Sequence, residues 1–184
     1  MGNENLNRDM ARHPLGGVEQ IDDERAALTF ERVYAYPVED VWAALTRPEE
    51  TIKWLAESDG DLQIGGAFNL RWRNVAEEDL EWWEGRILQI EPPNLFVYNN
   101  QAHGLLRWEL EPTDDDGGAG CRLKFTNVVN AVGEQALMSV AGWHTHLDHL
   151  QEALGGRSVD WPRWREDLYP AWEAVHADYV REYA

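Results

Sequence analysis

Cysteine is almost absent from this chain: Cys121 is the only one among 184 residues, so an internal disulfide bond is excluded. No run approaches the roughly 20 apolar residues that cross a bilayer, so we expect no membrane-spanning segment. Residues 1–25 contain no apolar stretch of the kind that marks a secretory signal peptide. The length suits one domain with extensions, and we expect a soluble cytoplasmic protein.

Basic residues are also scarce. Lys and Arg number 16 against 34 Asp and Glu, which gives a formal net charge of −18. A surface this acidic repels nucleic-acid phosphates and anionic lipid headgroups, so we expect neither nucleic acid nor a membrane as a partner. The charge is most simply interpreted as serving solubility, and a basic protein partner is the alternative.

Motifs for catalysis, metal binding and nucleotide binding are missing. The chain has no HExxH, CxxC or GxSxG, and its IGGAF segment lacks the acidic residue that follows a dinucleotide-binding loop. His144, His146 and His149 could suggest a metal site. On a helix, however, His144 lies well away from the other two, and a catalytic metal site usually needs a third protein ligand. We therefore predict no catalytic residue, no metal and no cofactor, and we expect His146 to hydrogen-bond to the sheet.

Aromatic side chains, in contrast, are abundant, with ten Trp, six Tyr and four Phe. Rings of this size must fill a core, line a cavity or form an exposed patch. Alternation of apolar and polar residues indicates a series of strands, separated by turn-forming residues such as Asp114–Gly118. The predicted strands cover residues 28–36, 68–73, 81–90, 95–100, 105–111 and 121–128.

Helices are predicted on both sides of these strands. Pro37 opens one amphipathic helix and Pro48 opens a short second helix that runs through Leu55. A long amphipathic helix follows the strands over Ala136–Leu154, since Trp143, Leu147, Leu150 and Leu154 recur at spacings that share one face.

Three segments follow from these patterns. Residues 1–24 are polar and aperiodic, which predicts a flexible N-terminal tail. Residues 25–156 form the predicted domain. Residues 157–184 are a predicted helical C-terminal extension, with Trp172, Val175 and Tyr179 on one stripe. This extension docks on its own domain in the simplest interpretation, while a homodimer or protein-partner contact is the alternative.

Several ordered segments carry a family likeness: FERVYAYPVEDVWAALTRPEETIKWL, IGGAFNLRW, GRILQIEPPNLFVY, LRWELEP and AGWHTHLDHLQEALGG. Over about Leu28–Gly156 the chain resembles the START-like SRPBCC superfamily, and within it the branch related to the activator of Hsp90 ATPase. The resemblance implies an α+β helix-grip fold, in which a curved antiparallel sheet wraps around the long C-terminal helix and leaves a deep apolar cavity. Such proteins include lipid carriers, plant hormone-binding proteins, polyketide cyclases and co-chaperone domains, so the fold leaves the activity open.

Strand parity selects the side chains that would face such a cavity. Asn100, Asn127 and the Tyr98 hydroxyl are candidate polar handles, because buried amides need partners that a ligand or water can supply. The alternative is that all these side chains pack together as a filled core. The predicted ligand-binding residues are Phe68, Leu70, Trp72, Trp83, Ile87, Phe96, Tyr98, Asn100, Leu106, Trp108, Leu123, Phe125, Asn127, Val140, Trp143 and Leu147.

The sequence thus predicts a protein that binds a small hydrophobic molecule between the sheet and the long helix, rather than an enzyme. Two alternatives stay open. One is an enzyme of cyclase or hydrolase type that acts on a similar ligand, and the other is an interaction module of the Hsp90-activator kind.

Overall fold

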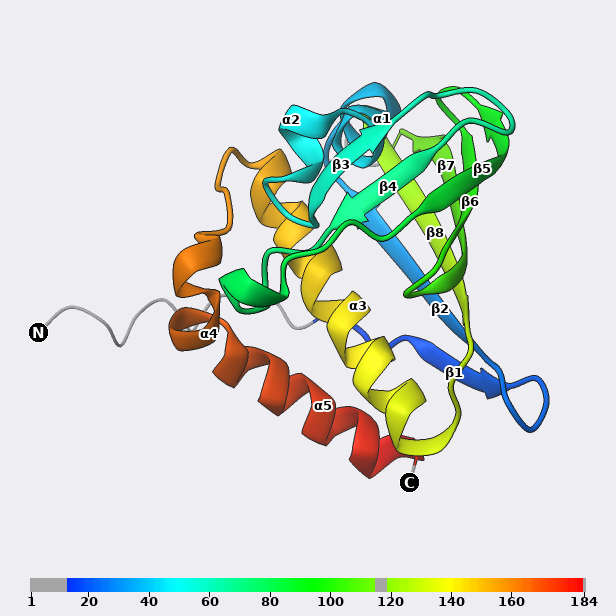
Figure 1. Ribbon diagram of the computed structural model, residues 1–184. Coiled ribbons are helices and arrows are strands. Elements are labelled where there is room, and N and C mark those ends of the chain that lie inside the picture. The colour runs from blue at the N-terminus through cyan, green and yellow to red at the C-terminus, as the bar shows by residue number, and fades with distance from the viewer. Residues whose placement is uncertain (1–12, 115–118, 184) are drawn as a thin grey trace, which may run out of the picture.

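The computed structural model describes residues 13–114 and 119–183. Residues 1–12 of the expected tail and residues 115–118 of the expected turn lie outside the described residues. Six antiparallel strands form one sheet in the spatial order β1-β2-β8-β7-β6-β5, and two further strands form a separate ribbon (Figure 1). The sheet strands are β1 (Gly17–Gln20), β2 (Ala26–Tyr34), β5 (Gly85–Glu91), β6 (Leu95–Asn100), β7 (Gly104–Thr113) and β8 (Gly120–Val129); the ribbon pairs β3 (Glu57–Gly60) with β4 (Phe68–Arg71).

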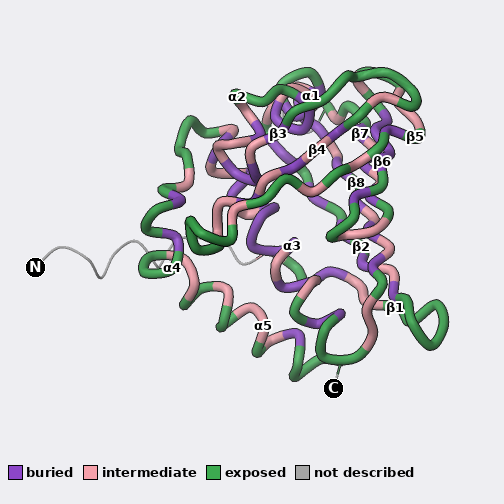
Figure 2. Tube along the Cα trace, in the orientation of Figure 1, coloured by how far each residue is buried: buried purple, intermediate pink, exposed green. Residues whose placement is uncertain are grey.

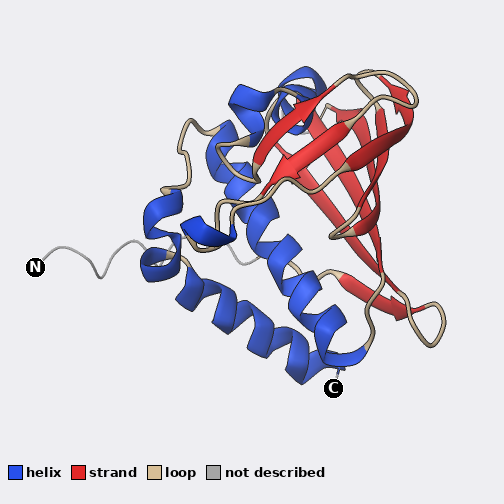
Figure 3. Cartoon of the chain, in the orientation of Figure 1, coloured by secondary structure: helices blue, strands red, loops and turns tan. Residues whose placement is uncertain are grey.

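The helices occupy the faces and ends of this sheet. The long helix α3 crosses one face of the sheet, and α5 runs alongside α3 on the side away from the sheet (Figures 1 and 3). The described helices are α1 (Val38–Thr46), α2 (Pro48–Thr51), α3 (Gly133–Leu154), α4 (Trp164–Asp167) and α5 (Tyr169–Tyr183), with short 3₁₀ turns η1 (Glu77–Asp79) and η3 (Trp161–Arg163). The arrangement is the predicted α+β helix-grip, with an additional helical segment at the C-terminal end.

Local sequence accounts for these elements. In β2, the side chains of Leu28, Phe30 and Tyr34 are buried while their neighbours Thr29 and Glu31 are exposed, as the two-residue period of a strand requires. Pro37 precedes α1, whose first turn carries acidic residues at the positive end of the helix dipole. Burial is concentrated on the strands and on α3, whereas α5 is largely exposed (Figure 2).

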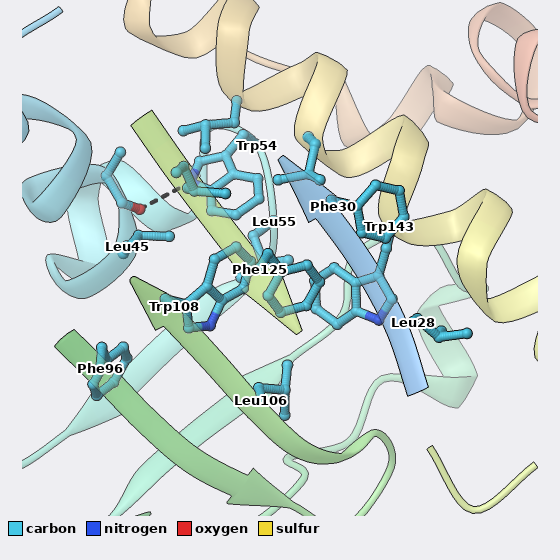
Figure 4. Close-up of a cluster of buried hydrophobic side chains, with 14 of the residues drawn as sticks. Leu28, Phe30, Leu45, Trp54, Leu55, Phe96, Leu106, Trp108, Phe125 and Trp143 are labelled. Atoms are coloured by element: carbon cyan, nitrogen blue, oxygen red, sulfur yellow. Dashed lines mark hydrogen bonds between the residues drawn. The ribbon is translucent and has the colours of Figure 1, made fainter. Parts of the chain in front are cut away.

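The centre of the sheet is filled with aromatic rings. Trp108 and Phe125 are cross-strand partners in β7 and β8, and their rings stack with centroids 3.8 Å apart (Figure 4). The Trp143 ring of α3 meets Phe125 edge-on at 4.7 Å, which joins the helix to the sheet. Burying one such side chain contributes about 1.5–3 kcal/mol. The space expected between the sheet and α3 is therefore closed over the middle strands.

Several boundaries differ from the sequence prediction, including the following three. Residues 17–20 form β1 instead of belonging to a flexible tail, because they pair with β2 and Val18 packs against the core. The strand predicted from residue 81 begins at Gly85, and before it Trp83 forms only an isolated bridge with Leu70. The second helix ends at Thr51, and hydrogen-bonded turns continue to Ala56.

Candidate functional site

An open pocket of about 640 Å³ lies beside the first half of α3. Its walls come from α3, from the segment between β4 and β5, and from the β6–β7 turn, and α5 contributes one side chain. We call it the aromatic pocket. It is lined by Trp72, Asn74, Val75, Asp79, Glu81, Trp83, Ala102, His103, Met138, Ser139, Gly142, Trp143, His146 and Trp172.

Only part of the predicted ligand-binding set reaches this pocket. Trp72, Trp83 and Trp143 line it. The other predicted residues are buried away from it, so they build the filled core and not the pocket wall. These are Phe68, Leu70, Ile87, Phe96, Tyr98, Asn100, Leu106, Trp108, Leu123, Phe125, Asn127, Val140 and Leu147.

The Asn127 amide, expected as a ligand handle, is fully engaged within the protein. Its Nδ2 donates to the carbonyl oxygens of His103 at 2.6 Å and Leu105 at 2.9 Å. Its Oδ1 accepts from the indole Nε1 of Trp143 at 2.7 Å. Because the three partners belong to the β6–β7 turn, β7 and α3, Asn127 fixes two walls of the pocket relative to each other.

Asn100 and Tyr98, the other two candidate polar handles, are also unavailable to a ligand. The Asn100 Nδ2 donates to the Trp83 carbonyl at 3.1 Å, and its Oδ1 accepts from the Ala102 backbone N–H at 2.9 Å. Tyr98 is buried, and that burial raises the pKa of its hydroxyl well above the usual range. Asn100 thereby positions two pocket-lining residues, Trp83 and Ala102, while Tyr98 belongs to the core.

The deeper wall of the pocket consists of rings in contact. The Trp72 ring lies edge-on to His103 at 4.7 Å, to His146 at 5.2 Å and to Trp143 at 6.0 Å between centroids. Such edge-to-face pairs stabilise one another beyond the area that they bury. His103 was missed in the sequence because it stands in a turn, where no hydrophobic period marks the facing side chains.

His146 is a neutral ring in this wall. Its Nδ1 lies 2.9 Å from the carbonyl oxygen of Trp54, which can only accept, so Nδ1 carries the proton and Nε2 is left as an acceptor. Burial lowers the pKa of His146 to about 4, and burial together with the neighbouring His146 lowers the pKa of His103 to about 4. The expected bond from His146 to the sheet is wrong: its partner lies in the turn after α2.

Trp72 carries a buried donor without a partner in the described part of the chain. Its side chain is 8% exposed, and its buried Nε1 has no hydrogen-bond partner among the described residues. An indole N–H can only donate, and leaving a buried donor without an acceptor costs about 1–3 kcal/mol.

Within residues 13–114 and 119–183, no three His, Cys, Asp or Glu side chains lie close enough to hold a metal ion. In the same residues, no helix combines the length and apolar character needed to cross a membrane. Cys121 is buried, and that burial raises the pKa of its thiol to about 11, so the thiolate form is disfavoured.

Comparison with known proteins assigns this sequence to a family. The sequence model of the Activator of Hsp90 ATPase homolog 1-like proteins matches residues 35–155. The chain belongs to this family. The matched segment spans α1 to the end of α3, so it contains most of the pocket, whereas β1 and α5 with Trp172 lie outside it. No curated protein matches the chain.

Solved structures support the same fold. CalU16 from Micromonospora echinospora is 23% identical, with a TM-score of 0.62 and a match covering 95% of this chain and 96% of that one. The protein encoded by BPP1335 of Bordetella parapertussis is 24% identical, with a TM-score of 0.63 over 91% and 90%. Protein NE0264 from Nitrosomonas europaea is 25% identical, with a TM-score of 0.58 over 74% and 97%. These likenesses support the helix-grip fold, and the names of the three proteins indicate no ligand.

Proposed function

We propose that this protein binds a small, largely apolar molecule in the aromatic pocket. The observation that carries the proposal is a pocket of about 640 Å³ whose deep wall is built from indole and neutral imidazole rings. Ligand sites in proteins typically enclose about 300–1,000 Å³ and combine apolar walls with a few polar groups. The Nε2 of His146, a residue that lines the pocket, is such a group and can accept a hydrogen bond.

Preorganisation further supports a binding role. The side-chain amides of Asn127 and Asn100 hydrogen-bond to residues in the walls of the pocket, so the walls keep their shape without a ligand. A preformed wall lowers the ordering cost of binding. The proposed site lies at one end of the space between sheet and α3, since the middle is filled by Trp108 and Phe125.

Gly142 allows a direct test. It lines the pocket on α3, and a Cβ added there meets open space. We expect Gly142→Trp to fill the pocket and abolish binding, while Gly142→Ala leaves room and also raises helix propensity by about 1 kcal/mol. Native mass spectrometry of gently purified protein detects the bound molecule, and unfolding releases it for identification. A ligand retained equally by both variants would contradict the assignment to this pocket.

The family description favours a second candidate, an interaction with an Hsp90-type ATPase. The C-terminal extension is the surface that we propose for a second copy or a protein partner. A pull-down with an Hsp90-type protein tests the partner, and the native mass spectrum reports the oligomeric state. Chemical change of the bound molecule during incubation would instead support the cyclase or hydrolase alternative.

A further inference from the structure

His146 keeps one ring nitrogen open to the aromatic pocket. Its side chain is 6% exposed and lines the pocket from α3. Its Nδ1 is bonded to the Trp54 carbonyl, while its Nε2 has no hydrogen-bond partner among the described residues. The neighbouring ring of His149, with its centroid 6.0 Å away, also has an unpartnered Nε2, but that atom is enclosed by the described protein. Of these two nitrogens, the one on His146 retains surface and can meet a bound molecule.

The hydrogen bond to Trp54 decides what this nitrogen does. A carbonyl oxygen can only accept, so Nδ1 carries the ring proton and Nε2 offers a lone pair. Protonation would turn Nε2 into a donor, but burial lowers the pKa of His146 to about 4, so the ring is neutral at pH 7. The nitrogen is thus a fixed acceptor, held in place by α3 and by Trp54.

The surroundings restrict the donor that can reach this acceptor. The rings of Trp72 and Trp143 have their centroids 5.2 and 6.1 Å from that of His146, so a group beside Nε2 packs against aromatic rings. The exposed carboxylates of Asp79 and Glu81 line the same pocket and disfavour an anion. A hydroxyl on an aromatic ring supplies the donor and the flat apolar surface together, and it brings no charge that has to leave water.

We infer that the ligand of the aromatic pocket is a phenol, whose ring hydroxyl donates its proton to Nε2 of His146. This inference rests on the proposed function, since it names the class of ligand for the same pocket and the residue that selects it. The methyl ether of such a ligand should bind more weakly. Its oxygen can only accept, its methyl group stands where the proton was, and Nε2 is left without a donor.

Two probes with the same ring system test the hydroxyl: 2-naphthol and its methyl ether, 2-methoxynaphthalene. Ligand-detected NMR titration at pH 7 measures both Kd values, and we expect a Kd about fivefold lower for 2-naphthol. Equal affinities, or tighter binding of the ether, would overturn the inference and leave the proposed function standing. Absence of binding by both probes would overturn both. Binding of 2-naphthol that survives Gly142→Trp would overturn the assignment to this pocket.

Substitutions at His146 separate its two ring nitrogens. His146→Asn keeps a donor for the Trp54 carbonyl near the position of Nδ1 but has no acceptor at Nε2, so it should abolish the preference for 2-naphthol. His146→Gln places an amide oxygen near the position of Nε2 and should restore much of the preference. The matched control is His149→Asn, which removes a buried imidazole from the same helix outside the described lining of the pocket and should keep the preference. A preference that survives His146→Asn, or that is lost equally in His149→Asn, would overturn the inference.

A measurement on the unaltered protein makes the test independent of how the variants fold. In protein labelled with ¹⁵N-histidine, the Nε2 resonance of His146 should shift when 2-naphthol is added, because that nitrogen accepts the hydroxyl proton. The methyl ether should shift it much less. Equal shifts with the two probes would overturn the inference.

The carboxylates at the rim are the competing acceptors for a hydroxyl. If they took the proton of 2-naphthol, Asp79→Asn/Glu81→Gln would abolish the preference over the ether and His146→Asn would keep it. That pair of results would overturn the role given to His146.

Discussion

The filled centre of the sheet and the aromatic pocket at its end use the same kinds of side chain with opposite results. In the centre, Trp108 and Phe125 stand opposite each other on paired strands and stack at 3.8 Å. In the pocket, Trp72 and Trp143 are 6.0 Å apart and come from a loop and a helix. Strand pairing holds partners about 5 Å apart and brings rings together. Where a loop and a turn replace the strand, no such pairing closes the gap.

Removing one ring from each region tests this comparison most strongly. Trp108→Ala opens a cavity in the centre, and we expect a loss of about 3–5 kcal/mol in the free energy of unfolding. Trp83→Ala removes a half-buried wall of the pocket and should cost much less while weakening ligand binding. Urea denaturation measures both. Equal destabilisation by the two variants would contradict the division into a structural centre and a binding end.

Asn127 joins the two regions, and its replacement should give the next largest effect. Asn127→Leu leaves the Trp143 N–H and the His103 carbonyl without their partner, so we expect a loss of about 2–3 kcal/mol in stability. Adding Trp143→Phe removes the stranded donor, and the double variant should lose less than the sum of the single ones. Strict additivity in denaturation experiments would show that the two side chains act independently.

Buried histidines make the pocket end sensitive to acid. The pKa of His146 falls to about 4 and that of His149 to about 3 in the folded protein, both chiefly through burial. At pH values between the ordinary histidine pKa near 6.5 and these lowered pKa values, the unfolded chain binds more protons than the folded protein. The stability that these histidines contribute is therefore present above about pH 6.5 and declines as the pH falls towards 4. Asp148, whose pKa burial raises to about 6, opposes this trend with a single group.

We therefore expect the free energy of unfolding to drop by at least about 1.4 kcal/mol, the equivalent of one pKa unit, between pH 7 and pH 5. Urea titrations at the two pH values measure it. His146→Gln keeps a polar side chain but cannot gain the proton, so it should flatten the dependence. If the stability of His146→Gln varies with pH as in the parent chain, His146 does not contribute to the pH dependence.

The smallest effect is expected at the docking of α5, which carries Trp172 to the pocket. The Tyr179 hydroxyl accepts from the Gly16 backbone N–H at 2.7 Å and lies 3.0 Å from Nδ1 of His144. Tyr179→Phe should cost about 1 kcal/mol and increase amide hydrogen exchange in α5. Tyr183→Phe, which loses one bond to the Gly16 carbonyl at the surface, is the matched control and should cost less. Unchanged hydrogen exchange in α5 of Tyr179→Phe would show that this contact does not hold α5 against the domain.

The strands and the long helix could be predicted because their periodicity is local. β6 was predicted with its observed bounds, and the start of α3 was misplaced by only a few residues. β1 was not predicted. It forms by pairing with β2, and Gly16, just before it, is held by Tyr179 and Tyr183 from the far end of the chain. Polarity alone suggested a tail there.

For the site, the pattern identified the inward side chains but not which of them face a pocket. Trp72, Trp83 and Trp143 were found, while His103, Gly142 and Trp172 were missed. The missed residues stand in a turn, on a helix face without apolar character, and on the C-terminal helix. His103 and Gly142 carry no hydrophobic period, and Trp172 stands on a predicted stripe whose contact with the cavity the sequence does not specify.

The sequence by itself determined the α+β class, the inward face of the predicted strands, the acidic charge and the family likeness, because these depend on residue type and spacing along the chain. Tertiary structure alone decided where the space lies. Whether facing rings meet or leave room depends on the separation of their backbones, and that separation is set by register, by turns and by bonds such as those of Asn127.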